Sequence, residues 1–71
     1  MIIEVFKTNI SHPRAVHTAI SSLLRVWPDW KINIDLHDCD NILRIESLSE
    51  VDVTWVSSHL SGIGYMAEVL E

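Results

Sequence analysis

Apolar and polar residues alternate in four segments of this chain. Because successive side chains of a β-strand point to opposite faces, such alternation predicts strands. The four predicted strands span Ile2–Lys7, Trp30–Leu36, Ile42–Glu46 and Tyr65–Leu70. In the third strand Leu43 and Ile45 are expected to face the core, whereas the first strand is expected to place Phe6 on the opposite, open face of the sheet.

A first helix is predicted between the first two strands, where apolar residues recur every third or fourth position. It runs from about His12 to Val26. Ser11 is the expected N-cap, and Pro13 falls in the first turn, where a missing N–H costs nothing. Pro28 ends the helix, because proline cannot continue it.

A second helix is predicted after the third strand. Ser49 would open it, with Asp52 three residues later in a partial capping box. Gly62 is expected to close it, because glycine readily adopts the left-handed backbone conformation found after helices. The expected buried stripe consists of Val53, Val56, Leu60 and Ile63.

The order strand, helix, strand, strand, helix, strand predicts an α+β, ferredoxin-like βαββαβ fold. Its simplest form is a four-stranded antiparallel sheet with both helices on one face. In this arrangement the third strand lies between the first and the second. A chain of 71 residues has room for one small core, so residues 1–71 are expected to form a single domain.

This topology brings three turns to one pole of the domain, and polar side chains gather there. The candidate metal ligands are His12, His37 and Cys39, with Asp38 and Asp40 as additional candidates. Imidazole, thiolate and carboxylate groups suit Zn²⁺ and similar divalent transition metals such as Ni²⁺ or Cu²⁺. The alternative is that Asp38–Asn41 simply form the hairpin turn and His37 is an exposed strand residue. No other cofactor is predicted.

Protein contacts are the other candidate function of the surface. The open face is expected to carry Ile2, Glu4, Phe6, Lys31, Asn33, Asp35, Arg44 and Glu46, joined by Met66, Glu68 and Leu70 according to register. Its mixture of apolar and charged residues favours a protein interface, including a homodimer. Trp55 and His59, four residues apart on the second helix, can stack. They are either a contact patch for a partner or a cover over the edge of the core.

Composition excludes several function classes. The net charge is −5 and the five basic residues are scattered, which disfavours nucleic-acid binding. No apolar run approaches the ~20 residues of a membrane helix, and the N-terminus lacks the pattern of a signal peptide. A single cysteine cannot form an internal disulfide, as is typical of a reducing, cytoplasmic setting.

Nearly the whole chain resembles the heavy-metal-associated, copper-chaperone-like domain family. The similar stretches are Ala19–Ile20 with Leu23 or Leu24, Trp27–Trp30, Ile34–Leu36 and Gly64–Val69. The resemblance implies the same βαββαβ fold. Members of that family bind soft metals through a C-x-x-C motif in the first loop. Asn9 and His12 occupy those two positions here, so the resemblance does not imply thiolate-based metal transfer.

The sequence therefore predicts a non-enzymatic accessory or interaction domain without the thiolate metal site of that family. Cys39 is not predicted to be a nucleophile, because its neighbours are acidic and only His37 could assist it. Divalent-metal binding through the polar cluster is the first alternative. The second is a small-ligand sensor, since Lys31–Ile34 is similar to a stretch of the ACT domain, an amino-acid-binding module of the same topology.

Overall fold

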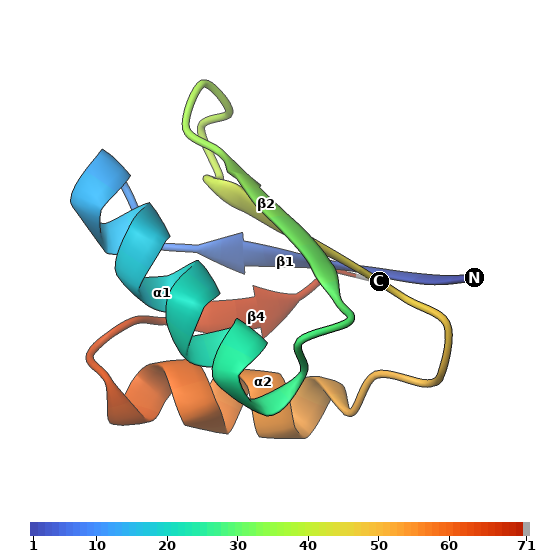
Figure 1. The fold of residues 1–71 in the computed structure, drawn as a ribbon. Coiled ribbons are helices and arrows are strands. Elements are labelled where there is room, and N and C mark those ends of the chain that lie inside the picture. The colour runs from blue at the N-terminus through green and yellow to red at the C-terminus, as the bar shows by residue number, and fades with distance from the viewer. Residues whose placement is uncertain (71) are drawn as a thin grey trace.

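The computed structural model describes residues 1–70 of the chain, and Glu71 lies outside the described residues. The elements are β1 (Ile2–Thr8), α1 (Pro13–Val26), β2 (Lys31–Asp35), β3 (Ile42–Ser47), α2 (Val53–Gly62) and β4 (Ala67–Val69). The strands form one antiparallel sheet in the order β2-β3-β1-β4, and both helices cover the same face of it (Figure 1). The predicted ferredoxin-like fold is confirmed.

The core lies between the sheet and the two helices. Its fully buried side chains are Phe6, Ile10, Ala19, Leu23, Leu43, Ile45, Val56 and Leu60. The alternation in β2 and β3 predicted the buried face correctly: Leu43 and Ile45 face the helices, and Ile32 and Ile34 of β2 lie opposite them in register. Burial of these side chains supplies most of the free energy that offsets the loss of chain entropy.

The prediction that Phe6 lies on the open face is wrong. Phe6 is fully buried and stands between Leu43 of β3 and Val69 of β4. Because side chains alternate along a strand, Ile2 and Glu4 also belong to the side that faces the helices. The open face of β1 is formed instead by Ile3, Val5 and Lys7.

The physical reason is that both sides of β1 carry apolar residues, so alternation alone leaves its phase ambiguous. Burial of the large aromatic ring decides the phase, because burying a phenylalanine side chain stabilises the fold by about 1.5–3 kcal/mol. Thr8, two residues further on, is also buried. Lys7 is then directed to solvent between them.

The helix starts also differ from the prediction. His12, not Ser11, is the N-cap of α1, and its side chain makes no capping hydrogen bond. Asp52, not Ser49, is the N-cap of α2, and its carboxylate accepts a 3.0 Å hydrogen bond from the backbone N–H of Trp55. A short acidic side chain immediately before the first helical residue is the stronger cap, because it also complements the helix dipole.

Gly64, not Gly62, supplies the left-handed residue at the end of α2. Gly62 is the last helical residue, whereas Gly64 has a φ of +96°. The N–H of Gly64 donates to the carbonyl of Ser61, and the N–H of Tyr65 donates to that of Leu60. This pair of bonds is a Schellman motif, which satisfies carbonyls that the helix leaves unpaired.

The two glycines give a matched stability test. Gly64→Ala is expected to lower the free energy of unfolding by about 1–2 kcal/mol, because an L side chain is strained at positive φ. Gly62→Ala is expected to raise it by about 0.4–1 kcal/mol, because alanine favours the helix. A Cβ at either position would meet no atom within 4 Å, so the two effects come from the backbone. Urea unfolding of both variants measures them, and effects of equal sign would contradict this assignment.

Candidate functional site

The hairpin between β2 and β3 is built by short acidic side chains that bond to their own backbone. The carboxylate of Asp35 accepts a hydrogen bond from the N–H of His37 at 2.9 Å, and that of Asp38 accepts one from the N–H of Asp40 at 2.8 Å. Asn41 takes the left-handed conformation, with a φ of +47°, and its N–H donates to the Asp38 carbonyl. Aspartate and asparagine favour these conformations, so the residues act first as turn formers.

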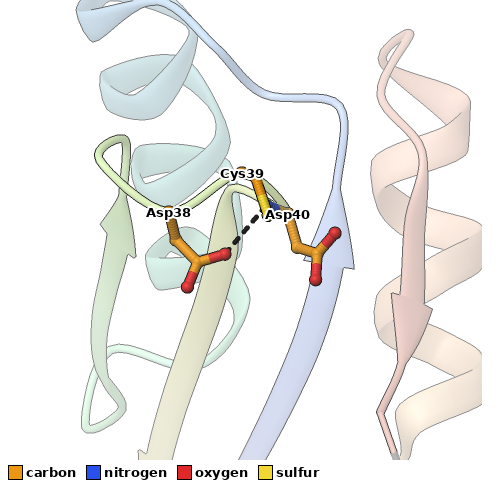
Figure 2. A group of neighbouring side chains, drawn as sticks. All are labelled: Asp38, Cys39 and Asp40. Atoms are coloured by element: carbon orange, nitrogen blue, oxygen red, sulfur yellow. Dashed lines mark hydrogen bonds between the residues drawn. The ribbon is translucent and has the colours of Figure 1, made fainter.

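Three potential metal-binding side chains meet in this turn, namely those of Asp38, Cys39 and Asp40, called here the hairpin group. One ligand atom from each lies within 4.8 Å of the others. Figure 2 shows Cys39 at the turn with the two carboxylates on either side of it. Asp38 and Cys39 are exposed and Asp40 is half-buried, and one Asp38 oxygen is already engaged by the N–H of Asp40.

The predicted histidine ligands do not join this group. Within residues 1–70, the hairpin group is the one cluster of at least three such side chains, and it contains neither His12 nor His37. His12 lies exposed at the start of α1, after the end of β1. The backbone N–H of His37 donates to the Asp35 carboxylate, near the start of the turn.

The predicted meeting of three turns at one pole is confirmed by hydrogen bonds that converge on Thr8 and Asn9. Thr8 donates its N–H to the Asp40 carbonyl at 3.0 Å and its hydroxyl to the Asn41 carbonyl at 2.6 Å. Asn9 donates its N–H to the Met66 carbonyl at 3.2 Å, and its side-chain oxygen accepts the N–H of Met66 at 2.8 Å. The end of β1 therefore ties the hairpin to the segment that leads into β4.

These bonds give Asn9 a structural role that the sequence pattern did not reveal. Its amide oxygen closes a reciprocal pair of bonds with Met66, which lies 57 residues further along the chain. An asparagine before a proline-led helix gives no indication of such a distant partner.

The three tryptophans of the chain form one cluster with His59 at the opposite end of β2. The Trp27 and Trp30 rings are stacked with centroids 5.2 Å apart, and Trp55 meets both edge-on at 5.9 and 6.4 Å. His59 stacks on Trp55 at 4.7 Å, as the spacing of four residues predicted. Its Nε2 is hydrogen-bonded to the hydroxyl oxygen of Ser22 on α1.

This packing limits what the predicted contact residues can do. Phe6 is fully buried and therefore inaccessible to a partner. Trp55 and His59 are half-buried, and both already have partners within the chain. Trp55 contacts the indole rings of Trp27 and Trp30, and His59 stacks on Trp55 and is hydrogen-bonded to the Ser22 hydroxyl. The cluster fastens α2 to α1 and to the start of β2, so Trp55 covers the edge of the core.

Apolar and charged side chains both occur on the face of the sheet that no helix covers. The open face is defined by the strand residues Ile3, Val5, Lys7, Lys31, Asn33, Asp35, Ile42, Arg44, Glu46 and Glu68. Two pairs of opposite charge stand directly across neighbouring strands: Lys31 faces Glu46, and Lys7 faces Glu68. Such cross-strand pairs stabilise an antiparallel sheet by about 0.2–1 kcal/mol each.

Apolar side chains are exposed at the open face and at its border. Ile3 is 46% exposed, in register with Glu46. Met66 and Leu70, two positions before and after Glu68, are 55% and 43% exposed. The predicted open-face residues of β2 and β3 are confirmed in place, and Glu68 with them, whereas β1 contributes the opposite set to the one predicted.

Neither α1 nor α2, the two helices in the described part of the chain, has the length and apolar character needed to cross a bilayer. No protein-family model, curated protein or solved structure matches this chain.

Proposed function

We propose that this chain is a small, non-enzymatic protein-interaction module whose contact surface is the open face of the sheet. The observation that carries the proposal is the arrangement of that face, on which partly exposed apolar side chains lie between balanced charges. Protein interfaces combine an apolar centre with a polar rim in the same way. A mostly charged surface would lack that apolar centre.

The helical face is a weaker candidate for the contact surface. Its aromatic side chains are engaged with one another in the tryptophan cluster, and His59 is bonded to Ser22. A partner would have to displace these contacts before it could bind. The open face needs no such rearrangement, because its side chains are held in register by the strands that carry them.

Site-specific photo-crosslinking tests the proposal. The benzophenone amino acid p-benzoylphenylalanine is placed at Asn33, an exposed residue of the open face, or at Thr18, an exposed residue of α1. Both variants are irradiated in cells that naturally make the protein. Adducts from position 33 that are absent at position 18 support the proposal. Equal adducts at both positions, or none at position 33, contradict it.

Divalent-metal binding at the hairpin group is the second candidate function. It is favoured by one observation, that the ligand atoms of Asp38, Cys39 and Asp40 lie within 4.8 Å of one another. The set mixes two hard oxygen donors with one soft sulfur donor, which suits a borderline ion such as Zn²⁺.

The metal candidate predicts a localised response to metal. One equivalent of Zn²⁺ should shift the backbone amide resonances of Asp38–Asn41 and leave those of α2 unchanged. Cys39→Ser should weaken that response at least tenfold, because a hydroxyl is a much poorer zinc ligand than a thiolate. His12→Ala is the matched control and should leave it unchanged. Unshifted hairpin resonances at stoichiometric Zn²⁺ would eliminate this function.

A further inference from the structure

The open face carries no net charge, although the chain as a whole is strongly acidic. Three of the five basic residues lie on it, namely Lys7, Lys31 and Arg44. Three acidic residues balance them, namely Asp35, Glu46 and Glu68. The entire net charge of −5 therefore belongs to the rest of the chain.

We propose that the partner of the open face is a second copy of this chain, an inference that rests on the proposed function. A strongly basic or strongly acidic partner would be matched by a face with an excess of one charge. A face that presents both signs in alternation can instead satisfy a copy of itself, as the self-complementary interface of a two-fold dimer requires. Face-to-face association also turns the acidic surfaces of the two copies outward and apart.

The apolar residues supply the attraction in this dimer. Val5 and Ile42 lie within the open face, Ile3 is partly exposed on it, and Leu70 stands at its border. Between stacked sheets these side chains would leave water together, at about 25 cal/mol for each Å² buried. The outer charges would then form the polar rim.

The area that a dimer interface requires is a modest share of the surface of this domain. A standard interface buries about 800 Å² on each partner. The total accessible surface is 4754 Å², so such an interface needs about one-sixth of it. Small domains with thin cores commonly gain stability by association, which gives the pairing a physical advantage beyond recognition.

The test measures the mass of the purified chain by sedimentation equilibrium between 10 µM and 1 mM. The wild-type mass is expected to rise from 8.1 kDa towards twice that value. Ile3→Lys, which places a charge on the open face, should weaken dimerisation at least tenfold. Thr18→Lys adds the same charge on exposed α1 and should not weaken it. Leu70→Lys is a second variant, at the border of the open face, and should also weaken dimerisation. Circular dichroism checks that each variant is folded.

The salt dependence of dimerisation is a second test of the inference. Raising NaCl from 50 to 500 mM screens the repulsion between two acidic chains and also the charge pairs across the interface. Because apolar burial supplies the attraction, the dimer should persist. A monomer mass at 1 mM would overturn the inference, as would a dimer weakened by Thr18→Lys but not by Ile3→Lys. If the purified chain is monomeric and position 33 still forms adducts with another protein in cells, the second-copy inference fails and the proposed function stands. A monomer without such adducts removes both.

Discussion

Phe6→Ala is expected to lower the free energy of unfolding by about 3–5 kcal/mol, the largest effect of any single change proposed for this chain. Phe6 is fully buried between β3 and β4, and its removal leaves a cavity under the helices. A domain of 71 residues has roughly 4–10 kcal/mol of stability in total. The variant should therefore lose at least about 12 °C of melting temperature, measured by circular dichroism at 222 nm.

The neighbouring residue is the control. Val5→Ala, on the open face, should cost no more than about 1 kcal/mol, which is the range of intrinsic strand propensity. Phe6→Leu keeps most of the buried volume and should cost less than about 1.5 kcal/mol. If Val5→Ala lowered the free energy of unfolding more than Phe6→Ala, the side chains of β1 would be assigned to the wrong faces. The dimer inference, which depends on that assignment, would then also be wrong.

Thr8→Val is expected to cost about 2–4 kcal/mol even though it preserves the shape of the side chain. The Thr8 hydroxyl donates to the Asn41 carbonyl at 2.6 Å and accepts the N–H of Ile10 at 3.1 Å, and the residue is buried. Valine would leave both backbone groups without their side-chain partner, the Ile10 N–H in a buried position and the Asn41 carbonyl in a partly buried one. Urea unfolding measures the loss, and hydrogen exchange at Ile10 should accelerate.

Two variants separate the lost hydrogen bonds from the lost volume. Thr8→Ser keeps the hydroxyl and loses one methyl group, so it should cost only about 0.5–1.5 kcal/mol. Thr18→Val removes a threonine hydroxyl that bonds to the Arg14 carbonyl on the exposed surface, and should change stability by less than about 0.5 kcal/mol. A Thr8→Val variant as stable as Thr8→Ser would show that the two bonds contribute little.

The fold could be predicted because the alternation in the strands, the spacing in the helices and the order of these elements all indicate the same arrangement. Strict alternation in β2 and β3 and helical spacing in α1 permit one layered arrangement. The phase of β1 could not be predicted, because Ile3 and Val5 on one side compete with Ile2 and Phe6 on the other. That choice depends on which set meets the helices, and this information lies elsewhere in the chain.

Helix boundaries were predicted less well than helix positions. Ser11 and Ser49 have good capping side chains, yet His12 and Asp52 occupy the caps. Pro13 fixes the first turn of α1 and so moves its cap one residue later. Which residue becomes the N-cap depends on the path of the chain between strand and helix as well as on the capping ability of its side chain.

The location of the candidate site could be predicted from the sequence, but the contacts among its side chains could not. The topology correctly indicated that the start of α1, the hairpin and the approach to β4 share a pole. It could not indicate that Asp38 would bond to Asp40, or that Asn9 would reach Met66. These bonds depend on side-chain directions within a few residues, which periodicity does not encode.

Because all three indoles stand together, the intrinsic fluorescence of this protein reports on one corner only. The five residues of β2 separate the tryptophan cluster from the hairpin by about 16 Å. A Zn²⁺ ion bound in the hairpin would leave the emission spectrum unchanged, whereas separation of α2 from α1 would alter it. The stacked pair of Trp27 and Trp30, at 5.2 Å, should also give exciton-coupled dichroism, an optical signal for the turn that joins α1 to β2.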